Sequence, residues 1–260
     1  MSRLRRAAAV GGAAEEGSYL VSVSDLMAGL LFVFIITLMV FAFNLRRAED
    51  SLRQAEEQKQ EEVKQLKGAD AARAQLLSTI QTRLAREGLA VEIDVEHGVL
   101  RLPEEILFRS GFDDFNPGGR ERLAVLADNL ATVLPCFTVG SIDRCPQRTY
   151  DANVEAVVIE GHTDDVPLLP GMRFKDNWQL SAARAIRTYE VLTSRSAELL
   201  SFRNERGEPL FGVAGYADSR RVALESTPEA RARNRRIDLR VLMTPPSTDE
   251  RPAVSEVVEF

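Results

Sequence analysis

The sequence has few residues of the kinds that bind metals or carry out covalent catalysis. Among 260 residues there are two cysteines and two histidines. Cys136, Cys145, His97 and His162 do not follow the spacing of a zinc site. No nucleophile–base pair or metal-ligand cluster stands out among the other residues. We therefore expect no metal, no cofactor and no enzymatic activity.

The sequence also lacks an excess of positive charge. Its formal net charge is −6, and no stretch forms a strongly basic face. Proteins that bind nucleic acid neutralise phosphates with clustered Lys and Arg. This composition therefore argues against nucleic acid as a partner.

Long apolar runs are absent with one exception, SVSDLMAGLLFVFIITLMVFAF at residues 22–43. Residues 21–43 in a helix extend about 34 Å, which is enough to cross a hydrocarbon core of about 30 Å. A cleaved signal peptide is the alternative, but the run is too long and no small-residue cleavage site follows it. We predict a transmembrane helix over residues 19–43, preceded by a tail of residues 1–18. Arginines flank the run on both sides, so the positive-inside rule does not decide its orientation.

Asp25 is the one ionisable residue inside this run. A carboxylate within a bilayer is unfavourable by about 2.5–3.5 kcal/mol and is kept where it faces protein or water. On a helix its neighbours are Ser18, Ser22, Ala28 and Gly29, and such small residues allow another helix to approach closely. Asp25 thus either faces a partner helix or begins the helix in the interfacial zone, and the residues alone leave both interpretations open.

Residues 44–87 predict a long helix, because they are rich in Ala, Glu, Gln, Lys and Arg, with one glycine and no proline. Leu45, Leu52, Leu66 and Ile80 share one heptad position, which Lys59 and Arg73 interrupt. A weak parallel coiled coil and a solvated spacer helix both fit this linker.

Residues 88–244 predict a separate folded domain. Alternating residues around His97-Gly98 indicate a hairpin, and VEAVVIEG, LFGVAGYA and RRIDLRVLM indicate strands. Helices are predicted over residues 116–134, with Pro117 in the first turn, and over residues 177–194. This alternation predicts an α/β sandwich, a mixed sheet with helices packed on it. Residues 245–260 are polar and contain proline, and we expect them to be disordered.

The two cysteines border a proline-flanked stretch, CFTVGSIDRC. In an oxidising compartment Cys136 and Cys145 would close a short disulfide loop, whereas in the cytosol they would stay free thiols.

Three motifs in this domain, GHTDDVP, NWQLSAARA and RNRRIDL, resemble those of the OmpA-like peptidoglycan-binding family. The resemblance covers residues 89–243 and implies binding of the diaminopimelate stem peptide. In that family the aspartate of the Thr-Asp pair and the arginine of Leu-Ser-x-x-Arg hold the zwitterionic ligand end. These positions are Asp164 and Arg184 here, and the resemblance places Thr163, Asn177, Leu180 and Arg235 in or near the same pocket.

A physical reason for these roles of Asp164 and Arg184 does not depend on the resemblance. A carboxylate attracts an ammonium group, and a guanidinium binds a carboxylate with two parallel hydrogen bonds. Asp164 and Arg184 would otherwise form an ordinary surface ion pair, which contributes little. The loop between them is longer than in outer-membrane members, and Ala217 and Val222 replace the usual Gly and Pro, so the rim of the pocket departs from the family pattern.

The order of tail, span with an aspartate, helical linker and OmpA-like domain resembles the MotB stator family. The resemblance implies a homodimer within a ring of five MotA-like subunits, and an ion, which we expect to be a proton, carried by Asp25. It also implies a cytoplasmic N-terminus, an inner-membrane span and a periplasmic domain. The span lacks the Trp of flagellar members and looks more like ZorB of the Zorya anti-phage system, whose partner is ZorA. The alternatives are a flagellar stator subunit and a passive tether between membrane and cell wall.

Overall fold

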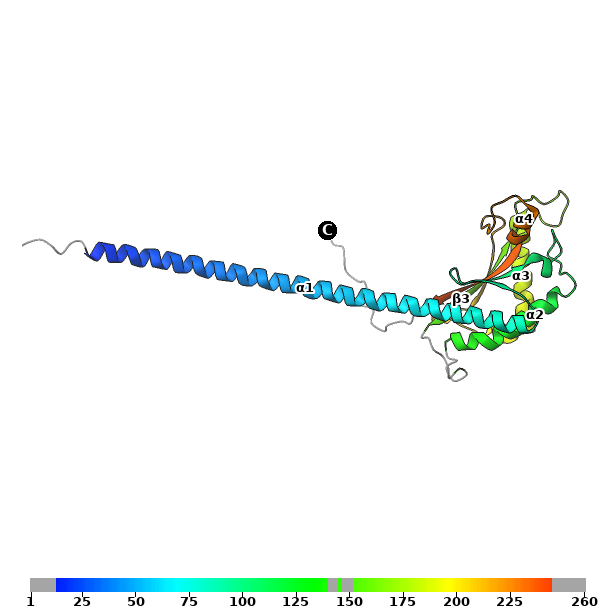
Figure 1. Ribbon diagram of the computed structural model, residues 1–260, viewed down its shortest axis with the longest axis horizontal. Helices are drawn as coiled ribbons and strands as arrows, with labels where there is room; N and C mark the ends of the chain where they lie inside the picture. Colours follow the sequence, from blue (N-terminus) through cyan, green and yellow to red (C-terminus); the bar gives the residue numbers. More distant parts are fainter. Residues whose placement is uncertain (1–12, 140–144, 146–151, 245–260) are drawn as a thin grey trace, which may run out of the picture. The chain divides into compact units, whose positions relative to one another are not determined.

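The computed structural model describes residues 13–139, 145 and 152–244, with side chains from Ser24 onward except Gln65. The chain divides into two compact units, Met1–Glu62 and Val63–Phe260. Helix α1, Ala13–Arg86, is continuous through the boundary between them (Figure 1). Most of the predicted tail of residues 1–18 and all of residues 245–260 lie outside the described residues.

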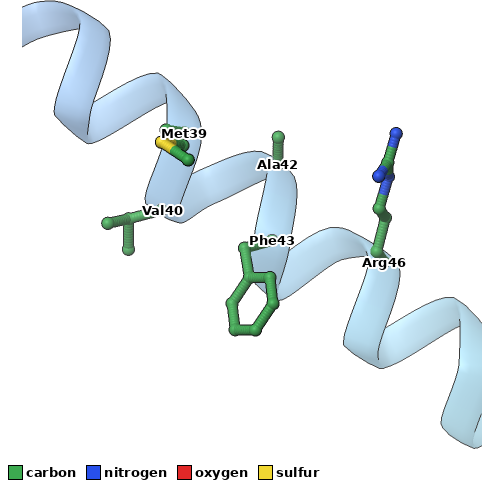
Figure 2. Close-up of a pocket in the computed structure, with 5 residues that line it drawn as sticks. All are labelled: Met39, Val40, Ala42, Phe43 and Arg46. Carbon is green, nitrogen blue, oxygen red and sulfur yellow. The ribbon is translucent and has the colours of Figure 1, made fainter.

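The first unit contains the apolar run, and it is helical throughout the described part. One helix among the described residues, from Ser24 on, is long and apolar enough to cross a membrane. Its most apolar stretch is wholly exposed. Figure 2 shows the end of the run, where Met39, Val40, Ala42 and Phe43 project from α1 and Arg46 follows one turn later. An exposed apolar surface of this length is stable only in a medium less polar than water.

The end of α1 belongs to the folded domain, which corrects the predicted domain start at residue 88. Ala72, Leu76, Leu77, Ile80 and Leu84 are at most 1% exposed and lie in the main hydrophobic core. Each buried Leu or Ile contributes about 1.5–3 kcal/mol relative to exposure. These residues recur at helical spacing, so the second half of the predicted linker packs as a core helix and is not a solvated spacer.

The domain is built on one five-stranded mixed sheet in the order β1-β2-β5-β3-β4. The strands are β1 Glu92–Asp94, β2 Val99–Pro103, β3 Asn153–His162, β4 Phe211–Gly215 and β5 Arg236–Thr244. β3 and β4 are parallel, and the other neighbours are antiparallel. The hairpin predicted at His97-Gly98 is confirmed, because β1 pairs with β2 and Gly98 takes the left-handed conformation that its turn requires.

Two long helices complete the core with α1: α2, Gly119–Val133, and α3, Asn177–Arg195. Pro117 precedes α2 instead of lying in its first turn, because Gly118 is the N-cap with φ 80°. The described residues also form the short helix α4, Pro228–Asn234, and the 3₁₀ turns η1 Glu104–Ile106, η2 Leu134–Phe137 and η4 Ala197–Leu200, which the sequence did not predict. The predicted fold class, an apolar helix followed by an α/β domain, is confirmed.

Close packing of α3 on β3 fixes the place of the motif residues. A Cβ atom at Gly161 would lie 2.0 Å from the carbonyl oxygen of Ser181, so only glycine allows this contact. β3 ends at His162, and Thr163 and Asp164 follow it beside the first turns of α3. Asp176 caps α3 by accepting a hydrogen bond from the backbone N–H of Gln179 at 2.9 Å.

A disulfide joins Cys136 in η2 to Cys145. Both ends are described, whereas residues 140–144 between them are outside the described part. The pairing is the one that the sequence predicts for an oxidising compartment.

Candidate functional site

A pocket of about 520 Å³ lies where β3, α3, η1 and the α4–β5 junction meet. It contains all six residues that the sequence motifs predict for ligand binding. Residues from three parts of the chain far apart in sequence, 104–112, 163–184 and 235, therefore converge at one place. The lining residues are Glu104, Ser110, Gly111, Phe112, Thr163, Asp164, Val166, Pro167, Leu168, Leu169, Met172, Asn177, Leu180, Arg184 and Arg235.

Asp164 is held at the edge of the pocket by one side chain and one backbone group. Its Oδ2 accepts a hydrogen bond from Nη1 of Arg235 at 2.7 Å, and its Oδ1 accepts one from the backbone N–H of Val166 at 3.1 Å. The carboxylate is 14% exposed. Asp164 is therefore ordered and still open to a ligand.

Thr163 and Asn177 shape the backbone around Asp164. Thr163 donates its hydroxyl to the carbonyl of Asp164 at 3.0 Å, and its N–H donates to the carbonyl of Ala217 at 2.9 Å. The amide of Asn177 donates to the carbonyls of Asp164 at 3.2 Å and Val166 at 2.9 Å. These two residues fix the loop after β3, and their hydrogen bonds are made to the protein itself.

Arg184 is buried, with 1% of its side chain exposed, and it does not pair with Asp164. Its Nη2 donates to Oε1 of Glu104 at 2.8 Å and to the carbonyl of Arg109 at 3.2 Å. Its Nε donates to the carbonyl of Phe112 at 2.9 Å. The alternative interpretation, a surface ion pair between Asp164 and Arg184, does not hold, because Arg184 forms a buried pair with Glu104. Nη1 donates to none of the described residues and is the part of this guanidinium left for a ligand.

Glu104 is a charged pocket residue that the sequence did not predict. It is 4% exposed, its Oε1 pairs with Arg184, and its Oε2 is buried without a hydrogen bond in the described part of the chain. Oε2 lies 3.4 Å from Nε of Arg235. Burial raises the pKa of Glu104, and the charge of Arg184 opposes that rise. The sequence held no signal that separates Glu104 from its neighbour Glu105.

Four charges therefore alternate along the pocket in the order Arg184, Glu104, Arg235, Asp164. Two carboxylates and two guanidiniums make its formal charge zero. Val166, Pro167, Leu168, Leu169 and Met172 form an apolar wall beside them. A neutral set of paired charges with an apolar wall suits a zwitterionic group at the end of an aliphatic chain.

A second charged cluster lies next to the pocket, at the end of β3 and on β5. The ring Nε2 of His162 is 3.7 Å from Oε2 of Glu160 and 3.5 Å from Oδ2 of Asp238, and all three side chains are buried. Burial lowers the pKa of His162 and raises that of Asp238. Burial also acts to raise the pKa of Glu160, but the nearby ring of His162 and the hydrogen bonds from Arg240 outweigh it and lower this pKa to about 2.

The ligand atoms of this cluster lie within 4.8 Å of one another, as in a metal site. However, guanidiniums already bind the carboxylates: Arg240 and Arg220 contact Glu160, and Arg236 contacts Asp238. Their positive charges oppose a cation at this position. We therefore interpret the cluster as a structural ion-pair network, and the absence of a metal stays a prediction.

Asp25 lies near the start of the exposed apolar surface of α1. Leu26 and Met27, which follow it, are about two-thirds exposed (66% and 67%). Its predicted role as an ion carrier depends on another chain and stays a prediction.

No family model matches the chain. Over 86 residues it is 30% identical to motility protein B of Bacillus subtilis (strain 168). This stretch covers 33% of this chain and 30% of that protein. The match therefore spans less than one third of that relative's length. Over 241 residues the chain is 27% identical to YtxE, an uncharacterized protein of the same organism. This stretch covers 86% of this chain and 88% of that protein.

Solved structures with a related arrangement include a MotB-like protein from Desulfovibrio vulgaris, with 26% identity and a TM-score of 0.48 over 72% of this chain and 99% of that one. The cell wall anchor of the T6SS from Pseudomonas aeruginosa gives 23% identity and a TM-score of 0.43 over 67% of this chain and 96% of that one. By sequence, the chain is similar to motility protein B over a third of its length and to YtxE over most of it.

Proposed function

We propose that this chain is a stator-type membrane protein that anchors itself to peptidoglycan through the pocket at Asp164 and Arg184. The observation that carries the proposal is the convergence of all six motif residues on one pocket with balanced charges. The sequence similarity to motility protein B supports it. The proposed ligand is the zwitterionic end of diaminopimelate in the stem peptide.

The pocket offers a partner for each ligand charge. Asp164, with an exposed edge, takes the ammonium group, and Nη1 of Arg184 takes the carboxylate. The apolar wall from Val166 to Met172 contacts the methylene chain. A hydrogen bond to a charged group contributes about 1.5–3 kcal/mol, so two such contacts suffice for specific but reversible binding of one stem peptide.

A peptidoglycan ligand implies the orientation that the charges around the span leave undecided. The domain then lies in the periplasm and the N-terminus in the cytoplasm, with the start of α1 crossing the inner membrane. The periplasm is oxidising, which agrees with the disulfide between Cys136 and Cys145.

The finer proposal is a proton-driven motor in which two copies of this chain stand inside five MotA-like or ZorA-like subunits. Asp25 alternates between a protonated form, which tolerates apolar contact, and an ionised form, which requires water or a polar group. Each proton crossing the membrane supplies about 2.3 kcal/mol per 100 mV of potential. Without attachment to the cell wall the torque would turn the two copies of this chain and not the ring around them, so the motor requires the peptidoglycan anchor. The ZorB-like span supports a role in anti-phage defence.

Sedimentation with purified sacculi tests the anchor. The full chain in detergent is expected to sediment with diaminopimelate-type sacculi and to stay in solution without them. A chain that remains in solution in both cases refutes the anchor. Purification together with the MotA-like or ZorA-like membrane protein then tests the motor. A ring of that protein around two copies of this chain supports the motor, whereas a dimer without a ring supports the passive tether.

A further inference from the structure

The side chain of Arg235 lies across the two carboxylates of the pocket. Its Nη1 is 2.7 Å from Oδ2 of Asp164, and its Nε is 3.4 Å from Oε2 of Glu104. Its backbone is fixed at the start of β5, because its N–H donates to Arg231 and its carbonyl accepts from Glu104. The carboxylates available for a ligand ammonium therefore already hold a cation of the protein.

Arg235 is held much less firmly than Arg184. It makes one side-chain hydrogen bond and is 28% exposed, whereas Arg184 makes three and is 1% exposed. Oε2 of Glu104 accepts no hydrogen bond from Arg235, and a buried acceptor without a partner is unfavourable. The pocket thus contains one movable guanidinium and one unsatisfied carboxylate oxygen.

We propose that Arg235 determines ligand specificity by exchanging partners. The ligand's ammonium group replaces the guanidinium at Asp164, with Oε2 of Glu104 as a second acceptor. The displaced guanidinium turns on its fixed backbone and pairs with the ligand's carboxylate, which Nη1 of Arg184 binds as well. This inference rests on the peptidoglycan-binding function proposed above.

The exchange favours a zwitterion because every charge then has a partner before and after binding. A ligand with an ammonium group but no carboxylate leaves the guanidinium of Arg235 unpaired. A ligand with a carboxylate but no ammonium group cannot displace Arg235 from Asp164. The pocket should therefore distinguish diaminopimelate from lysine, which has the same ammonium-bearing chain without the second carboxylate.

Two synthetic tripeptides, Ala–γ-Glu–diaminopimelate and Ala–γ-Glu–Lys, test this directly by calorimetry on the full chain in detergent. Wild type is expected to prefer the diaminopimelate peptide. In Arg235→Gln that preference should fall by about 10- to 100-fold, the equivalent of one charge-assisted hydrogen bond. The lysine peptide should bind Arg235→Gln more tightly than wild type, because Asp164 is then free.

Arg231→Gln is the matched control. Arg231 pairs with Asp165 at 2.8 Å and does not line the pocket, so its loss should leave both affinities unchanged. Arg235→Lys, which keeps a movable cation without the planar fork, should retain the preference for diaminopimelate.

If Arg235→Gln lowers the affinity for both peptides equally, or changes neither affinity, the partner exchange is overturned, but the proposed binding of peptidoglycan is not. Loss of the preference in a folded Arg235→Lys protein would overturn it too, since a fixed bidentate clamp predicts that result. A wild-type chain that binds neither peptide contradicts the proposed function itself, and the inference falls with it.

Discussion

The guanidinium of Arg184 lies 2.8 Å from the carboxylate of Glu104, and both side chains are buried. This pair joins α3 to η1, directly after β2, across 80 residues of sequence. Arg184 also donates to the carbonyls of Arg109 and Phe112, so it fixes the segment that forms one wall of the pocket. The residue expected to bind a ligand at the surface is therefore also part of the domain's structure.

Arg184→Ala is expected to destabilise the domain as well as to abolish binding. It leaves the carboxylate of Glu104 buried without a partner, and breaking a buried pair in this way is unfavourable by about 3–5 kcal/mol. Thermal unfolding followed by circular dichroism measures the loss. The double change Glu104→Leu with Arg184→Met removes both charges and should recover most of the stability but none of the binding. An Arg184→Ala protein as stable as wild type would show that the pair is not formed.

Asp164→Asn is expected to weaken binding to diaminopimelate-type sacculi by about 10- to 100-fold, because it removes one charge-assisted contact. Stability should change little, since Asp164 is partly exposed and the amide oxygen of Asn can still accept one of its two hydrogen bonds. Asp165→Asn is the matched control, because Asp165 pairs with Arg231 and does not line the pocket. Sedimentation with increasing amounts of sacculi measures the affinity of each variant. If the Asp165 variant loses binding and the Asp164 variant does not, the pocket is wrongly assigned.

The sequence predicted the strands and the two long helices of the domain because their signals are local. Alternation around His97-Gly98 marks β1 and β2, a short apolar run marks β3, and an apolar face marks α2. The motifs predicted six residues for one ligand site, and all six line one pocket in the structure. Their role in binding stays a prediction. Glu104 could not be found in this way, because its partner Arg184 is 80 residues away and Glu105 beside it has the same side chain. The end of α1 was assigned to the linker because residues 44–87 as a whole have a charge-rich, helix-forming composition, although residues 74–82 carry no charge and contain part of the buried stripe from Leu76 to Leu84.

Glu160 should make the stability of the domain depend on pH in the acid range. Its pKa in the folded chain is about 2, below its ordinary value of 4.5. A depressed pKa stabilises the folded state above pH 4.5, and this contribution is lost as the pH falls toward 2. The difference of about 2.5 units corresponds to about 3 kcal/mol. Unfolding at pH 7 and pH 2.5 should show wild type more stable than Glu160→Gln at neutral pH and nearly equal to it in acid.

His162 and Asp238 titrate in the same cluster, so the comparison with Glu160→Gln is the decisive measurement and not the pH profile of wild type alone. If wild type and Glu160→Gln differ in stability by the same amount at both pH values, the arginine partners do not lower the pKa of Glu160.

Cys136 and Cys145 should be joined in protein isolated from its native compartment, as they are in the structure. Closing a loop of this length contributes roughly 2–3 kcal/mol in the chain-entropy model. Mass spectrometry after alkylation without reductant should find neither cysteine modified. The Cys136→Ser with Cys145→Ser variant should unfold at lower temperature and keep its affinity for sacculi, because neither cysteine lines the pocket. Two alkylated thiols in the untreated protein would contradict both the pairing and the periplasmic location.

Asp25→Asn is expected to leave membrane insertion, dimerisation and sacculus binding intact and to abolish the biological activity. Asparagine keeps the size and hydrogen bonding of the side chain but cannot exchange a charge, so a proton pathway through this position stops. Protection of cells against phage, at equal amounts of protein in the membrane, measures the effect. Asp25→Glu serves as the control, because it keeps a titratable carboxylate and should retain part of the activity. If the Asn variant protects as well as wild type, no ion passes by way of Asp25, and the chain acts as a passive tether between the membrane and the cell wall.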